Sequence, residues 1–491
     1  MNVTLLSNLG FYVPELLIIF TLCAVLFTEA FYEPTEKNRF IVFVISGIGQ
    51  LVALSVLMSQ LGQKPTTVFF NAIVIDGIST FTKIIMVLGT MGVTYLSYFS
   101  KEIVEEAKSE FLSITLGVLV GGMLLVSANN LLTLYLGIET LSILSYILSS
   151  LKKNDHKSLE AGLKYALYGG LSAGLMVFGI SHIYGLLGTI HFAEIAVKIP
   201  SVLSAGTVSH LGLLLSFLLL FVGLGFKIAC VPFHMWSPDV YQGSPLPVTA
   251  FFSIVPKIAG LVAILRVTQV FFLKESSLQA SWVNLLQMIA ILTMTVGNIS
   301  AIGQTSIKRL LAFSSIAHAG MMLLAVLVMS AKGNNAVLFY AFNYLFMTMG
   351  AFFIASFVTD KVGNDSTFYF KGLIHKNPLM ACLMIMVLFS LAGIPPFSGF
   401  IAKFNIFSVL IEHKYYGVTM IAGINSVISL YYYMKLIKMM VFDAPEFEGD
   451  IEGFNFQNQV VILCITLPIF ILGIFWEKIM LVTQGASIFI P

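Results

Sequence analysis

Long apolar runs fill the sequence and decide what it can fold into. A helix that crosses a bilayer needs about 20 mainly apolar residues, and about 14 stretches of the chain meet that requirement. Only 10% of the 491 residues are charged and 58% are hydrophobic, whereas soluble domains carry roughly 25% charged residues. The sequence therefore predicts an all-α polytopic membrane protein with about 14 transmembrane helices. They are expected to start near residues 11, 40, 72, 111, 130, 161, 209, 246, 282, 309, 335, 377, 416 and 457.

The sequence lacks the signatures of several functional classes. The formal net charge of +2 gives no field that would attract nucleic acid. The four cysteines stand singly in apolar runs, and no zinc, iron–sulfur, haem or nucleotide-binding motif is present. The first apolar run carries Glu15 and has no basic leader, so no cleavable signal peptide is indicated. We therefore expect a chain with no metal and no cofactor of its own.

Lysine and arginine are unevenly shared between alternate loops. If the N-terminus lies outside, the inward loops and helix ends hold about 14 basic residues and the outward ones about 6. Inward loops of membrane proteins are enriched in these residues, so the split supports both the helix count and this orientation. We expect the bacterial inner (plasma) membrane as the location, surrounded by lipids, with the mitochondrial inner membrane as the alternative.

Six basic residues remain inside the proposed helices. A lysine at the bilayer centre costs about 2.5–3.5 kcal/mol on insertion scales. Arg266 lies near a helix end, from which its side chain can reach the interface, and Lys83 is ambiguous. The other four would together cost on the order of 10 kcal/mol if unpaired, which makes them candidate functional residues. They are Lys164, Lys227, Lys257 and Lys403.

One carboxylate, Glu139 in LYLGIETLSILSYIL, lies alone in an apolar stretch and is the expected partner of a buried lysine. A carboxylate and an ammonium favour each other's charged form, so a small change in their separation can move protons. A static buried ion pair is the alternative. Lys164 in EAGLKYALYGG is a second candidate, although Glu160 and the loop KKNDHK are close enough to bind it at the inner surface instead.

Prolines interrupt two apolar helices, one in each half of the chain. Pro232 follows Lys227 in GLGFKIACVPFHMWSPDV, and Pro395 and Pro396 precede Lys403 in LAGIPPFSGFIAKF. Proline removes a backbone hydrogen bond, and freed backbone groups are tolerated in a membrane only against protein or a wet cavity. Paired interrupted helices are typical of inverted-repeat transporters with sites at mid-membrane.

These breaks predict a division of the chain into four parts. Residues 1–110 form an N-terminal three-helix segment, and residues 442–491 form an acidic loop and a C-terminal helix. Between them, residues 111–272 and 273–441 form two inverted five-helix repeats, each with one proline-broken helix.

Lys257 and two histidines are candidates for proton transfer. Lys257 directly follows Pro256, and His318 lies about two turns inside the segment SIKRLLAFSSIAHAG. Histidine titrates near neutral pH, but a lone membrane histidine is as often only a hydrogen-bond partner between helices. His234 lies just past the first break, where it would line the proton access path.

The stretches FKIACVPFHMWSPDVYQGSPLPVTAFFSIVPKIAGL, SIKRLLAFSSIAHAG and LAGIPPFSGFIAKF resemble the antiporter-like membrane subunits of respiratory complex I, the proton-pumping NADH–quinone oxidoreductase. The resemblance spans roughly residues 110–445. The total length and the amino-acid sequences of the segments EAGLKY and MWSPDVYQGSP favour the N type over the M and L types.

The resemblance implies a role for each matched residue. Glu139 and Lys227 form a Glu–Lys switch, Lys164 modulates it, Lys257 relays the proton, and Lys403 lies near the outward route. His318 extends the relay. FMN, iron–sulfur clusters and quinone belong to partner subunits, and the expected neighbours are the M, L, K and J types. A stand-alone or Mrp-type sodium/proton antiporter is the alternative function.

Overall fold

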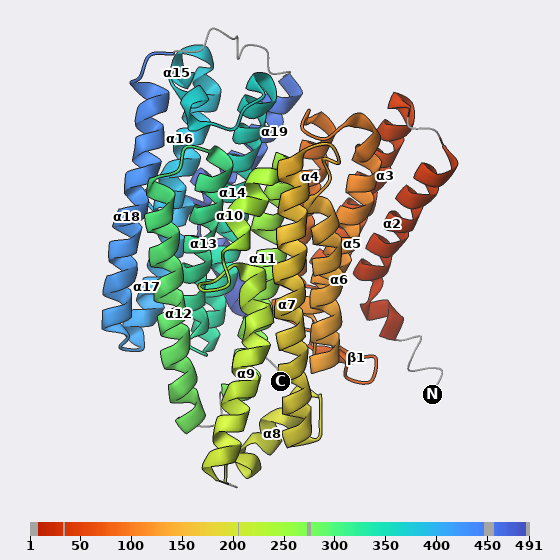
Figure 1. The fold of residues 1–491 in the computed structure, drawn as a ribbon, viewed down its shortest axis with the longest axis vertical. Helices are drawn as coiled ribbons and strands as arrows, with labels where there is room; N and C mark the ends of the chain where they lie inside the picture. The colour runs from red at the N-terminus through yellow and green to blue at the C-terminus, as the bar shows by residue number, and fades with distance from the viewer. Residues whose placement is uncertain (1–7, 33–34, 205, 273–275, 446–455, 488–491) are drawn as a thin grey trace.

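The computed structural model describes residues 8–32, 35–204, 206–272, 276–445 and 456–487, and it is almost wholly helical (Figure 1). Of the acidic loop expected at residues 442–456, residues 446–455 lie outside the described part. The long helices run roughly parallel to one another, and the short helices α8 and α15 lie at opposite ends of the bundle (Figure 1). Such an arrangement satisfies backbone hydrogen bonds within each helix, as a bilayer demands.

The helix count agrees with the sequence-based prediction. Thirteen described helices are long and apolar enough to cross a membrane, and a fourteenth apolar segment is divided into two 15-residue helices. The first half of the chain holds α2 (Val13–Phe31), α3 (Glu36–Gln60), β1 (Thr66–Val68), β2 (Ile73–Ile75), α4 (Gly77–Phe99), η1 (Glu105–Ala107), α5 (Lys108–Val126), α6 (Leu131–Ser149), α7 (His156–Leu187), α8 (Phe192–Leu203), α9 (Thr207–Ile228) and α10 (Trp236–Gly243).

The second half holds α11 (Leu246–Phe272), α12 (Ser276–Ile302), α13 (Ile307–Val326), α14 (Ala331–Val362), η2 (Thr367–Phe370), α15 (Leu373–Lys376), α16 (Pro378–Ala392), α17 (Ser398–Glu412), α18 (Tyr416–Val441), α19 (Phe456–Ile474) and α20 (Glu477–Ala486).

One helix starts later than expected. The third apolar run begins as the strand β2, which pairs antiparallel with β1, and α4 starts only at Gly77. The Asp76 side chain accepts a hydrogen bond from the Ser79 backbone N–H, and the Ser79 hydroxyl accepts one from the Asp76 backbone N–H. This reciprocal capping fixes the start of the helix.

Helix contacts recur in the same order in the two halves. In the first half α5 packs on α6, α7 on α9 and α10, and α9 on α11. In the second half α12 packs on α13, α14 on α16 and α17, and α16 on α18. Because each unit has five spans, an odd number, the second unit starts on the opposite side of the membrane. The recurrence supports two inverted repeats, whose boundaries stay a prediction.

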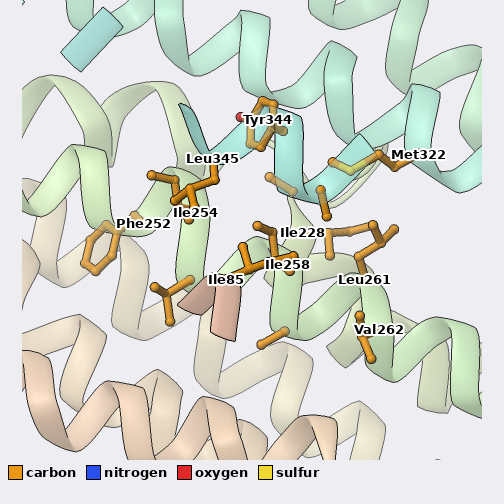
Figure 2. Packing of buried hydrophobic residues seen from close by; sticks show 14 of the residues in the cluster. Ile85, Ile228, Phe252, Ile254, Ile258, Leu261, Val262, Met322, Tyr344 and Leu345 are labelled. Atoms are coloured by element: carbon orange, nitrogen blue, oxygen red, sulfur yellow. The ribbon is translucent and has the colours of Figure 1, made fainter. Parts of the chain in front are cut away.

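The helix α11 forms the centre of the bundle, and every one of its residues is buried. Figure 2 shows Ile254, Ile258 and Leu261 of this helix among apolar side chains of its neighbours, which include Ile85, Ile228, Met322, Tyr344 and Leu345. Because both halves of the chain pack on α11, residues placed on it lie between the two repeats.

Two basic side chains inside the helices form ion pairs with carboxylates. Lys83 Nζ lies 2.5 Å from Glu15 Oε1, and both side chains are buried. Arg266, near the end of α11, was expected to extend its side chain toward water, but the side chain is buried within the bundle. It is 1% exposed, with Nη2 2.6 Å from Asp76 Oδ1 and Nε donating to the Val126 carbonyl. The Asp76 carboxylate at the N-terminus of α4 therefore compensates the buried charge of Arg266 in place of water.

Candidate functional site

The first helix break lies between the end of α9 and the start of α10. Pro232 lies within it, and Ala229 turns the chain with a φ of 57°. The Phe226 carbonyl that the break exposes accepts a hydrogen bond from the Trp236 indole at 3.0 Å. The backbone N–H of Val231 donates to Thr293 Oγ1. Protein side chains therefore satisfy freed backbone groups, as the bilayer requires.

Lys227 occupies the last turn of α9 and is 1% exposed. Its ammonium donates to Ser142 Oγ and to the Tyr165 hydroxyl, each at 3.2 Å. It also lies 5.3 Å from the centre of the Tyr165 ring. Hydroxyls and an aromatic face, rather than a carboxylate, thus solvate this buried charge.

Glu139 lies on α6, one helical turn before Ser142, and is partly exposed. Ser142 contacts Lys227, but the described structure shows no ion pair between Glu139 and Lys227 within 4.0 Å. The Glu139 Oε1 atom is buried and has no hydrogen-bond partner among the described residues. The predicted pair is therefore brought to neighbouring positions without direct contact, with Ser142 at the Lys227 ammonium.

Lys164 lies at the edge of the bundle, not beside Lys227. Its ammonium lies 2.6 Å from Glu160 and 2.8 Å from Asp239, and Asp239 also binds Arg309 at 2.7 Å. Lys164, Glu160 and Asp239 line part of a pocket of about 160 Å³. Lys164 therefore binds Glu160, the alternative that the sequence had left open, and the residue beside it, Tyr165, contacts Lys227.

Lys257 lies on the central helix α11 and is 2% exposed. Its ammonium donates to Ser315 Oγ on α13 and lies 5.3 Å from the centre of the Tyr241 ring. One turn further along α11, a Cβ on Gly260 would lie 3.3 Å from Lys227 Cβ. The missing side chain at Gly260 thus lets the stem of Lys227 cross close to the helix that carries Lys257.

The second break separates α16 from α17 and contains Pro395 and Pro396. Gly393 ends α16 with a φ of 85°, a conformation that favours glycine. Lys403 is 6% exposed, and its Nζ donates to the Ala392 carbonyl at 2.8 Å. The ammonium thereby meets the negative end of the α16 dipole, where a cation is stabilised.

His318 lies one turn after Ser315 on α13 and is 5% exposed. Its Nδ1 is 2.6 Å from the Tyr340 hydroxyl, and its Nε2 is 3.3 Å from the Tyr433 hydroxyl. His318 and Lys403 line one cavity of about 10 Å³. A cavity of this size is at the lower limit for holding one water molecule, which would lie between the two side chains.

His234 lies in the turn between α9 and α10 and is 7% exposed. Its Nδ1 has no hydrogen-bond partner among the described residues. Within the same described part of the chain, no group of three or more His, Cys, Asp or Glu side chains is placed to hold a metal ion.

The partners of the buried basic residues separate two classes. Seven lysine and arginine side chains are buried in the described part of the chain. Four form ion pairs with carboxylates: Lys83, Lys108, Arg266 and Lys308. The other three ammonium groups form no ion pair there and contact hydroxyls, a carbonyl or aromatic rings: those of Lys227, Lys257 and Lys403. Burying an unpaired charge is costly, so these three are the positions where function is indicated.

Sequence reasoning missed the neutral groups between the lysines. Hydroxyls of Ser142, Tyr165 and Ser315 contact two of the lysines, and Tyr340 and Tyr433 contact His318. Serine and tyrosine are common in apolar helices, so only their helical spacing from Glu139, Lys164 and His318 could have singled them out.

Comparison with known proteins identifies the family. Residues 128–429 match the family model of the NADH:quinone oxidoreductase/Mrp antiporter membrane domain. The chain is 40% identical to NADH-quinone oxidoreductase subunit N of Trichlorobacter lovleyi over 446 residues, 90% of this chain and 89% of the relative. It is 35% identical to chloroplastic NAD(P)H-quinone oxidoreductase subunit 2 of Mesostigma viride, over 98% of this chain and 96% of the relative.

Solved structures of membrane complexes contain chains with the same fold as this one. A chain in the structure of respiratory complex I from Thermus thermophilus matches with a TM-score of 0.81 and 29% identity, over 96% of this chain and all of that one. A chain of the Mrp complex from a Dietzia species matches with a TM-score of 0.77 at 18% identity, which shows a shared fold. The resemblance found in the sequence is confirmed, and the chain belongs to the NADH:quinone oxidoreductase/Mrp antiporter family, with subunit N of NADH-quinone oxidoreductase among its relatives.

Proposed function

We propose that this chain is a proton-translocating membrane subunit of NADH–quinone oxidoreductase. It couples quinone reduction in partner subunits to proton movement through Glu139, Lys227, Lys257, His318 and Lys403. The family and the names of its relatives support the assignment to this enzyme. The observation that carries the residue-level proposal is the contrast between three buried lysines that form no ion pair among the described residues and four buried basic residues with carboxylate partners.

The proposed proton path runs from Lys227 at the first helix break to Lys403 at the second. The groups along it can both donate and accept a proton. Lys227 contacts two hydroxyls, and its stem packs on α11, which carries Lys257. From there Ser315 leads along α13 to His318, and the shared cavity leads to Lys403. A hydroxyl or an imidazole can accept a hydrogen bond on one side and donate one on the other, which is what stepwise transfer needs.

Glu139 controls the first step in this proposal. When its carboxylate approaches Lys227, the ammonium form is favoured, and when the two separate the proton is released toward Lys257. The described structure supports this proposal in that Ser142, rather than Glu139, contacts the Lys227 ammonium. The redox groups, FMN, iron–sulfur clusters and quinone, belong to partner subunits, and the M, L, K and J types are the proposed membrane neighbours. The bacterial inner membrane is the proposed location.

The test is the replacement Lys227→Ala in the assembled enzyme. Inverted membrane vesicles report NADH oxidation, quinone reduction and proton uptake in the same sample. We expect assembly to persist and proton-coupled turnover to be lost. Full quinone reduction with a normal number of protons per NADH would refute the role of Lys227. Lys153→Ala is the control, because its side chain is 75% exposed and lies in a loop.

A separate measurement addresses the antiporter alternative. The purified chain, without partner subunits, is reconstituted in vesicles and sodium/proton exchange is followed with a pH-sensitive dye. The proposal expects no exchange above empty vesicles. Robust exchange by the isolated chain would favour the stand-alone function instead.

A further inference from the structure

The short helix α10 carries aromatic side chains near Lys227 and Lys257, two lysines of the proposed proton path. Near its start, the Trp236 ring stacks on Tyr165 with ring centres 4.3 Å apart, and the Tyr165 hydroxyl binds Lys227. Near its end, the Tyr241 ring lies 5.3 Å from the Lys257 ammonium. All three aromatic side chains are buried. A displacement of this eight-residue helix would therefore change the contacts of both lysines at once.

The position of α10 is held from outside its own repeat. Arg309, in the first turn of α13, donates to Asp239 at 2.7 Å and to Gln242 at 3.1 Å. The preceding residue, Lys308, donates to the Ser244 carbonyl at the end of α10. Two consecutive cations of the second repeat thus bind three residues of α10 and its C-terminal end: Asp239, Gln242 and Ser244.

Asp239 is the centre of this arrangement. One of its carboxylate oxygens accepts from Arg309 on α13, and the other accepts from Lys164 on α7. A single side chain therefore joins α7, α10 and α13. The helix α7 also carries Tyr165, which contacts Lys227, and α13 also carries Ser315, which contacts Lys257.

We propose that α10 is a positioning element that sets the environments of Lys227 and Lys257 together, and that Asp239 determines where it lies. Asp239 is a positioning residue, since it acts through Trp236 and Tyr241 and touches neither lysine's ammonium in the described structure. This inference rests on the proposed proton path. It also gives Lys164 a role through Asp239, in place of direct contact with the Glu139–Lys227 pair.

A natural reporter lies at the break. The Cys230 thiol is fully buried just before Pro232, whereas Cys23, Cys382 and Cys464 are exposed on other membrane helices. Membranes that contain the intact enzyme are treated with a membrane-permeant maleimide, and modification of each cysteine is followed by peptide mass spectrometry. The three exposed cysteines serve as internal standards for the reagent.

Asp239→Asn removes the charge that both cations bind. Charge-assisted hydrogen bonds are the stronger class, so we expect the labelling rate of Cys230 to rise by about tenfold, with the other cysteines unchanged. In the same membranes, protons taken up per NADH should fall while the amount of assembled enzyme stays constant. Asp239→Glu restores the charge and should return both measurements toward wild type.

Two further variants separate positioning from simple loss of a surface charge. Glu160→Gln also removes a carboxylate from Lys164 but leaves α10 untouched, and Cys230 labelling should stay within about twofold of wild type. Glu412→Gln breaks an exposed pair with Lys332 far along the chain and is the control for activity. If Asp239→Asn prevents assembly, Arg309→Lys carries the same test, because it keeps the charge and weakens the double contact with α10.

Unchanged Cys230 labelling in Asp239→Asn would overturn the inference, and so would increased labelling with a normal proton ratio. An equal rise in Glu160→Gln would also overturn it, since the effect would then come from Lys164. None of these outcomes decides the proposed proton path, which the Lys227→Ala variant tests separately.

Discussion

The buried pair of Lys83 and Glu15 gives a sharp test of how structural and functional lysines differ. Their side chains are 2% and 1% exposed, and the two charged atoms lie 2.5 Å apart. Lys83→Met removes one charge and leaves the Glu15 carboxylate buried without its partner. Breaking a buried pair in this way costs about 3–5 kcal/mol, and insertion scales give about 2.5–3.5 kcal/mol for a charge at mid-membrane.

The two figures agree on roughly 3 kcal/mol, which corresponds to a shift of about 100-fold in the folding equilibrium. Glu15→Gln together with Lys83→Met removes both charges, and the combined change should cost no more than about 1 kcal/mol. The assays are the amount of assembled enzyme in membranes and its rate of irreversible inactivation on heating. We expect the single variant to be depleted and heat-labile, and the double variant to resemble wild type.

Proton uptake per NADH decides whether the reasoning holds. Whatever enzyme assembles should pump normally in both variants, because a static pair takes no part in transfer. A double variant that assembles fully but pumps fewer protons per NADH would show that Lys83 belongs to the path. The distinction drawn here between lysines with and without carboxylate partners would then be refuted.

Other predictions concern the groups that connect the lysines. Ser315→Ala should lower proton-coupled turnover several-fold, because Lys257 loses the hydroxyl to which its ammonium donates. Ser315→Thr keeps a hydroxyl and should retain turnover. Turnover above 80% of wild type in the alanine variant would contradict this prediction. Gly260→Val should push α9 away from α11 at the stem of Lys227 and lower the stability of the protein by about 1–3 kcal/mol, which is measured as faster heat inactivation. Unchanged stability would contradict the close crossing of the two helices. Tyr340→Phe should slow NADH-driven proton uptake with unchanged assembly, and an unaltered rate would remove that tyrosine from the relay.

Much of the fold could be predicted from the sequence because a bilayer allows so few solutions. Apolar runs of the right length must become helices, so the number of spans follows from local sequence. The breaks at Pro232 and at Pro395–Pro396 were also predicted, whereas Pro256 lies inside the continuous helix α11 and breaks nothing. The same argument failed for the start of α4. There a capping box at Asp76 and a short hairpin decided the boundary, and these depend on contacts within about ten residues rather than on hydropathy.

The site was predictable only in its charged members. The cost of burying a charge singles out a lysine from its sequence position, but it does not tell which carboxylate lies next to it. Lys83 and Arg266 found partners from other helices, and Lys164 found Asp239 75 residues away in the chain. Such pairings depend on how helices face one another across the bundle. The apolar sequence between the paired residues does not indicate which helix faces will be in contact.

The hydrogen bond from Lys403 to the end of α16 has a consequence for how a proton can leave. A lysine that loses its proton becomes an amine, and an amine still donates hydrogen bonds through its remaining N–H groups. The Ala392 carbonyl therefore keeps its donor in both protonation states. What is lost is only the attraction between a cation and a helix end, about 0.3–1 kcal/mol at exposed sites and up to about 2 kcal/mol at partly buried ones. Charge can thus depart from the second break while the hydrogen-bonded framework around it stays in place.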